Sequence, residues 1–128
     1  MGHPAIGVML DCFHWHCAGE TPDDVRGLSD KQVVGVHVND AIAGRSTDEQ
    51  MAMERELPRA SGEIDLRAFL QALQLIEYDG PVTAEPMSRA LEALPRDAAI
   101  AATRGSMLAM FADAGIDAGV RTPVTTGP

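Results

Sequence analysis

IGVMLD, at residues 6–11, is a short and continuously apolar run that ends in an aspartate. Such a run is typical of a strand that is buried on both faces, as strands of a parallel sheet are. Two further runs have the same character: VVGVHV at residues 33–38 closes near a histidine, and VTA at residues 82–84 is followed directly by a glutamate. The three runs predict three short strands, each of which ends near a side chain that can bind a metal ion.

Helical patterns lie between and after these runs. Thr21-Pro22-Asp23-Asp24 places an N-cap threonine before a proline at the first helical position and an acid at the capping-box position, which predicts a short helix ending near Leu28. A second helix is expected from Asp65, because apolar residues recur there at helical spacing. These residues are Leu66, Phe69, Leu70, Leu73 and Ile76.

A last helix is expected from about Arg96, just after a proline, to Ala112, with Gly115 as its stop. Its inward-facing residues are expected to be Ile100, Met107, Leu108 and Phe111. Strands that alternate with helices in this way predict an α/β fold with a parallel sheet, although periodicity alone leaves both a barrel and an open sheet possible.

The organisation of the chain follows from its length and composition. With 128 residues, 45% of them hydrophobic, one domain is expected over residues 1–115, followed by a flexible tail over residues 116–128. The charged stretch from Ala41 to Gly62 is expected to be a long, mobile loop, and loops of that length are usually functional.

The net charge and the first residues of the chain exclude some classes of partner and location. The formal net charge of −9 argues against a nucleic-acid partner, because phosphate backbones are bound by basic faces. The chain opens without a basic segment or a long apolar stretch, so a cytoplasmic protein with no membrane partner and with reduced Cys12 and Cys17 thiols is expected.

Three strand ends carry candidate metal ligands: Asp11, His37 and Glu85. The carboxyl ends of parallel strands converge on one rim, so these side chains can meet although they are far apart in sequence. Two carboxylates and an imidazole suit a divalent ion such as Mn, Mg, Co or Zn. A compact zinc site within residues 12–17, which hold two cysteines and two histidines, is the alternative, but all its ligands would fall within one small loop.

Four stretches together resemble a known family. They are Gly7 to Trp15, Val36 to Asp40, a loop made of Arg55 to Pro58 and then Gly62 to Leu66, and Tyr78 to Pro86. In this order they resemble the C-terminal portion of the sugar phosphate isomerase/epimerase family, within the xylose-isomerase-like TIM barrel superfamily. The resemblance implies a partial (β/α)8 TIM barrel of about three βα units, corresponding to the C-terminal strands. One departure is Pro58-Arg59, where family members often have Pro-Gly.

The resemblance also implies roles for individual residues. Asp11, His37 and Glu85 would be metal ligands, and Glu85 would also be a catalytic base. His14 would be a catalytic residue that holds or protonates a substrate oxygen, and Arg55 would bind a substrate hydroxyl or phosphate.

The implied activity is that of a divalent-metal-dependent sugar, sugar phosphate or inosose isomerase or epimerase, which removes a proton next to a metal-bound carbonyl. Asp40 would orient the His37 ring without binding the metal itself. A complete member has eight strands, with a fourth ligand and an opposing base in its N-terminal half. A companion N-terminal half or a homo-oligomer is therefore expected, and the alternative is a non-catalytic metal-binding or interaction module, a truncated remnant of such an enzyme. A related endonuclease activity is disfavoured by the acidic charge.

Overall fold

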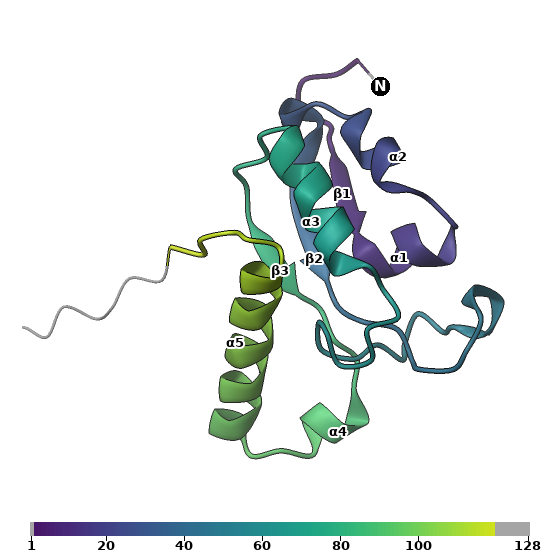
Figure 1. Ribbon diagram of the computed structural model, residues 1–128, viewed down its shortest axis with the longest axis vertical. Coiled ribbons are helices and arrows are strands. Elements are labelled where there is room, and N and C mark those ends of the chain that lie inside the picture. The colour runs from purple at the N-terminus through teal and green to yellow at the C-terminus, as the bar shows by residue number, and fades with distance from the viewer. Residues whose placement is uncertain (1, 120–128) are drawn as a thin grey trace, which may run out of the picture.

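The computed structural model describes residues 2–119, whose helices and strands alternate along the chain (Figure 1). In order, the elements are β1 (Val8–Asp11), α1 (Cys12–Cys17), α2 (Pro22–Arg26), β2 (Val33–Val38), α3 (Leu66–Leu75), β3 (Val82–Ala84), α4 (Arg89–Glu92) and α5 (Arg96–Asp113), with short 3₁₀ turns at Asp30–Gln32 and Thr47–Glu49. Residues 120–128, most of the expected tail, lie outside the described part. None of the described helices is both long and apolar enough to cross a membrane.

The three strands form one parallel sheet in the order β1-β2-β3. The register pairs Asp11 with His37, and His37 with Thr83 on the third strand. Glu85 follows β3 and donates its backbone N–H to the Val38 carbonyl at 3.0 Å. The α/β prediction is confirmed, and the register brings the three strand ends to the same rim.

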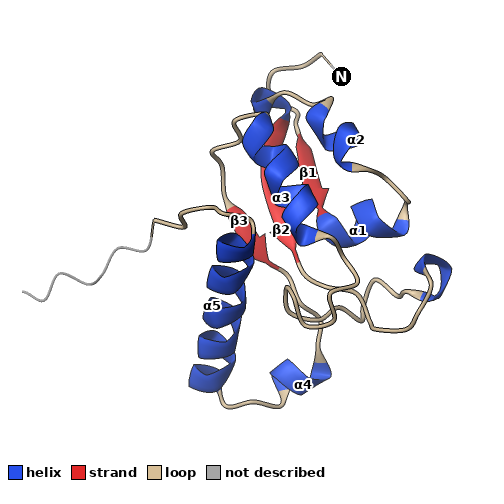
Figure 2. Ribbon diagram, viewed as in Figure 1, coloured by secondary structure: helices blue, strands red, loops and turns tan. Residues whose placement is uncertain are grey.

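Helix α3 covers one face of this sheet (Figure 2). The predicted stripe is confirmed in that Leu66, Phe69, Leu70 and Leu73 are buried, in one core with residues of β2 and α1. Each such side chain stabilises the fold by roughly 1.5–3 kcal/mol on burial. The helix starts where the Asp65 carboxylate accepts the Ala68 N–H at 3.0 Å.

The end of α3 is closed by a left-handed residue. Tyr78 N–H donates to the Leu73 carbonyl at 3.1 Å and Glu77 N–H donates to Gln74 at 2.9 Å. This pattern is a Schellman motif, in which glycine normally holds the left-handed position. Here Glu77 holds it, with φ of 58°.

The stretch after β1 forms helix α1, which was not predicted from the sequence. The Asp11 carboxylate caps this helix by accepting the Phe13 N–H at 2.8 Å and the His14 N–H at 3.4 Å. Trp15 then packs against Phe69 of α3, with ring centroids 5.2 Å apart. The helix was missed because its cap is also the last residue of a strand.

Helix α5 corrects a second expectation. Ile100 was expected to face inward, yet it is 56% exposed, because the first half of α5 extends beyond the end of the sheet (Figure 1). The fully buried residue of this helix is Met110. Met107 and Phe111 are half-buried against the core as expected, and Gly115 ends the helix with φ of 71°.

The stretch expected to be a mobile loop is tied to the sheet in two places. Isolated antiparallel bridges join Asp40 to Glu56 and Arg55 to Met87. Residues 55 and 56 therefore run between the end of β2 and the segment that follows β3. This places the Arg55 side chain at the rim where the three strands end.

Candidate metal centre

Asp11, His37 and Glu85 meet at the carboxyl-terminal rim of the sheet. Each offers one ligand atom, and these atoms all lie within 4.8 Å of one another. All three residues are partly buried. The expected convergence of strand ends has therefore brought together all three predicted ligands, as parallel strands do at one rim.

The distances show how the donors are arranged. His37 Nδ1 lies 2.9 Å from Glu85 Oε2 and 3.8 Å from Asp11 Oδ2. The other oxygen of Asp11, Oδ1, caps α1. Asp11 thus presents a single fixed oxygen to the site, while the more exposed Glu85 carboxylate is 37% accessible to solvent.

Arg55 occupies the same cluster. Its Nη1 donates to Asp11 Oδ2 at 2.9 Å and to Glu85 Oε2 at 3.1 Å, and its side chain is only 6% exposed. Its Nε donates to the Ala52 carbonyl at 2.6 Å, and the guanidinium lies 4.9 Å from the centre of the Phe13 ring. The sequence suggested an arginine on a charged loop, whereas the structure buries it between two of the predicted ligands.

Asp40 supports the loop instead of His37, to which it makes no hydrogen bond in the described structure. Its carboxylate is fully buried and accepts the backbone N–H groups of Ala41, Ser61, Gly62 and Ile64 at 2.8 to 3.1 Å. An aspartate directly after a strand is equally suited to both tasks, and only the fold decides between them. Its contribution to the site is indirect, because the loop that it closes carries Arg55.

His14 lies on the first turn of α1, next to the rim. Its ring is exposed and meets the Phe13 ring edge-on, with centroids 5.7 Å apart. It is not among the three grouped ligands. Its place beside Asp11 leaves it accessible to a molecule approaching the rim from solvent.

The cysteines do not form the alternative zinc site in the described structure. The Cys12 thiol is buried and lies 3.3 Å from both the Asn39 amide oxygen and the Asn39 backbone nitrogen. Burial raises the pKa of this thiol far above its ordinary value, so it stays protonated and is a poor metal ligand. Burial also raises the pKa of the Cys17 thiol, less strongly. Cys12 instead joins the ends of β1 and β2.

The donor set fits a divalent cation. Two carboxylates and an imidazole are ligands that hard and borderline divalent ions accept, and the site already holds one positive group, the Arg55 guanidinium, between its carboxylates. No fourth acidic, histidine or cysteine ligand joins this group within residues 2–119. Phe13 was missed as a site residue, since nothing marks an aromatic ring as the support of a distant arginine.

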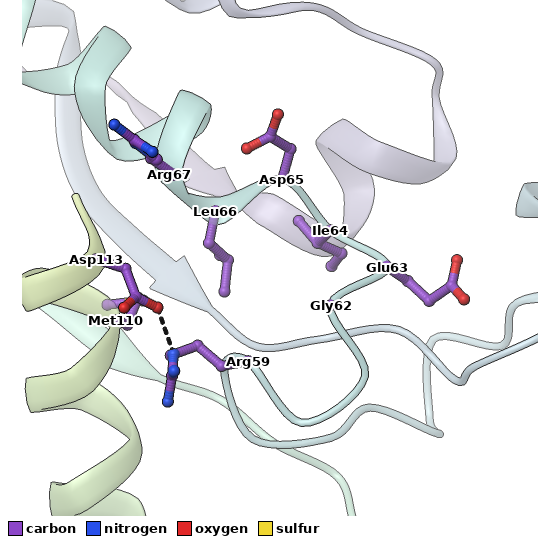
Figure 3. Close-up of a pocket in the computed structure, with 9 residues that line it drawn as sticks. All are labelled: Arg59, Gly62, Glu63, Ile64, Asp65, Leu66, Arg67, Met110 and Asp113. Carbon is purple, nitrogen blue, oxygen red and sulfur yellow. Dashed lines mark hydrogen bonds and ion pairs between the residues drawn. The ribbon is translucent and has the colours of Figure 1, made fainter.

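A hollow of about 510 Å³ lies elsewhere, between the loop before α3 and the end of α5 (Figure 3). Arg59 and Asp113 form an ion pair across it. None of the three ligands lines it. Arg59 has φ of 72°, so the Pro58-Arg59 pair adopts here the left-handed conformation that glycine would hold without strain.

Comparison with known proteins agrees with this geometry. Residues 1–109 match a family model described as a xylose isomerase-like TIM barrel. The chain is 31% identical over 94 residues to a 3-dehydroshikimate dehydratase of Pseudomonas putida, covering 73% of the chain and 15% of that protein. It is 31% identical over 88 residues to an inosose isomerase of Bacillus velezensis, covering 66% of the chain and 30% of that protein.

Among solved structures, the chain is similar to the IOLI protein crystallised with a binding zinc atom. The TM-score is 0.78 at 23% identity, over 84% of this chain and 38% of that one. The match supports a partial barrel as the fold. The chain spans less than a third of the length of either curated relative, so the activities named for those proteins belong to longer chains than the part compared.

Proposed function

We propose that this chain, which belongs to the xylose isomerase-like TIM barrel family, supplies three ligands of a divalent-metal centre to an isomerase or epimerase of small carbohydrates or polyols. The observation that carries the proposal is the meeting of Asp11, His37 and Glu85 at one rim. The similarity to an inosose isomerase and to a zinc-containing structure supports both the reaction class and the metal. The proposed ion is Mn, Mg, Co or Zn.

The proposed reaction depends on acidity next to a carbonyl group. A divalent cation held by these ligands would polarise the substrate carbonyl and so favour loss of a proton from the neighbouring carbon. Glu85 is the proposed base, because its carboxylate is the most exposed of the three ligands. His14, exposed beside the rim, is proposed to hold or protonate a substrate oxygen.

Only one nitrogen of the Arg55 guanidinium is proposed to contact the substrate. Nη1 is engaged by Asp11 and Glu85, and Nε by the Ala52 carbonyl. Nη2 makes no hydrogen bond to any of residues 2–119, so it is the atom proposed to reach a substrate hydroxyl or phosphate at the rim.

Further parts are proposed to come from outside these strands. An opposing base and a fourth ligand would be supplied by a companion half-barrel or by a second copy of the chain, which would also cover the exposed Met9 and Val34 side chains of the sheet. Free Cys12 and Cys17 support a cytoplasmic location. The dehydratase relative favours one second candidate: dehydration, which can start from the same proton removal.

The test is exchange of substrate protons with solvent. The chain is incubated in D₂O with Mn²⁺ and an inosose or a ketose, and loss of the proton next to the carbonyl is followed by ¹H NMR. Exchange that disappears in Glu85→Gln but persists in the matched surface variant Glu63→Gln supports the proposal. Metal binding with no exchange on any substrate would favour the non-catalytic module.

A further inference from the structure

Arg55 is the most deeply buried charge of the metal centre. Its side chain is 6% exposed, against 10% for Asp11 and 37% for Glu85. A buried guanidinium is retained only where carboxylates compensate the loss of its hydration. Two carboxylates that lie close together also repel each other unless a cation lies between them. Arg55 and the two ligands therefore depend on one another.

The guanidinium is also held by groups that are not ligands. The Ala52 carbonyl accepts from Nε at 2.6 Å, and the Phe13 ring lies 4.9 Å below the guanidinium carbon. Behind it, the Arg55 backbone exchanges hydrogen bonds with Met87 at 3.2 and 2.8 Å. The positive charge is consequently fixed at this position by main chain and by an aromatic face, even if its contacts with the carboxylates are broken.

The guanidinium uses the oxygens that an ion would need. Asp11 Oδ2, which receives Nη1, is the Asp11 oxygen left free by the cap of α1. Glu85 Oε2, which also receives Nη1, is the oxygen that lies 2.9 Å from His37 Nδ1. A divalent ion between the three ligands would meet the same lone pairs and would carry charge of the same sign.

Resting on the metal centre proposed above, we infer that Arg55 is a built-in competing cation, which gathers Asp11 and Glu85 before an ion binds and limits how tightly the ion is then held. Arg55 is thus a positioning residue for metal affinity. Removing its charge removes repulsion toward the ion, and repulsion between charges a few ångströms apart in a partly buried site is large.

The first test is titration of Mn²⁺ into the full chain by isothermal calorimetry. Arg55→Met, which keeps length without charge, is expected to bind roughly tenfold more tightly than the wild type. Arg55→Lys, which keeps the charge, is expected to stay within about threefold of it. If the wild type binds Mn²⁺ and Arg55→Met binds it equally or more weakly, the inference is wrong. The proposed metal centre would still be supported by binding to the wild type. No binding by any of the three proteins would overturn both.

A second measurement needs no variant. In wild-type protein labelled with ¹⁵N-arginine, the Arg55 guanidinium signal is followed by NMR while diamagnetic Mg²⁺ or Zn²⁺ is added. The signal is expected to shift with the same midpoint as ion binding, because the ion takes over the lone pairs that Arg55 occupied. A saturated site with an unchanged Arg55 signal would overturn the inference.

Discussion

His37 Nδ1 lies 2.9 Å from Glu85 Oε2, a contact that joins the end of β2 to the residue just beyond β3. It depends on the parallel register, in which His37 is paired with Thr83. A slip of one residue would turn His37 to the other face of the sheet. The grouping of these side chains at one rim is therefore a product of strand register as much as of residue type.

Loss of His37 is expected to weaken metal binding. His37→Ala should lower the affinity for Mn²⁺ by about a hundredfold or more, because even residues behind the ligands contribute ten- to a hundredfold. Calorimetry measures this directly. His3→Ala, in the exposed segment before β1, is the matched control and should bind as the wild type does. Equal affinities in the two variants would argue against His37 as a ligand.

Asp40 is expected to govern stability. Asp40→Asn places an amide donor against backbone N–H donors, and the loss of buried charge-assisted hydrogen bonds should reduce the free energy of unfolding by about 2–4 kcal/mol. Urea unfolding followed by Trp15 fluorescence measures the change. Asp48→Asn, at an exposed position on the same loop, should change stability by less than about 0.5 kcal/mol. Similar losses in both variants would contradict the assigned role.

Glu77 offers a stabilising substitution. Glu77→Gly removes the strain of a left-handed residue at the end of α3 and should raise the free energy of unfolding by about 0.5–1 kcal/mol. Thermal unfolding would show this as a higher Tm. Glu77→Ala keeps the Cβ atom and should give no gain, so a gain in both variants would point to the charge of Glu77 instead of its backbone.

Stability should fall in alkaline solution because of Cys12. Burial raises the pKa of its thiol in the folded protein above the ordinary value of 9.0, so the unfolded chain loses this proton first as pH rises. The contribution of Cys12 to the free energy of unfolding is therefore constant below pH 9.0. Above pH 9.0 it decreases by at most about 1.4 kcal/mol per pH unit. Urea unfolding at several pH values measures the slope. In Cys12→Ala the decrease in stability that comes from this thiol should vanish. The same dependence of stability on pH in wild type and Cys12→Ala would refute the assigned role of Cys12.

Much of the fold was accessible from sequence because its signals are local or periodic. The three apolar runs predicted the parallel strands, and the stripe that begins at Leu66 predicted α3. The meeting of Asp11, His37 and Glu85 could be predicted because parallel strands of known direction end on one rim. For these three residues, the side-chain chemistry and the position at a strand end both predicted a shared candidate site.

The failures concern residues whose partners are distant in the chain. Ile100 has the right spacing to face inward, but nothing in the pattern of α5 shows that this part of the helix runs past the sheet. Asp40 was assigned to His37, although three of the four hydrogen-bond partners of its carboxylate, Ser61, Gly62 and Ile64, lie more than twenty residues later in the chain. The burial of Arg55 likewise depends on a loop path that no periodicity describes.

The two oxygens of Asp11 serve different ends, since one caps α1 and the other faces the site. A relative without the proposed metal site would still need the capping oxygen. Asparagine retains a capping oxygen without the negative charge, whereas alanine would forfeit both. Loss of the proposed metal site is thus expected to leave asparagine at this position, because asparagine keeps the cap of α1 and the folded scaffold with it.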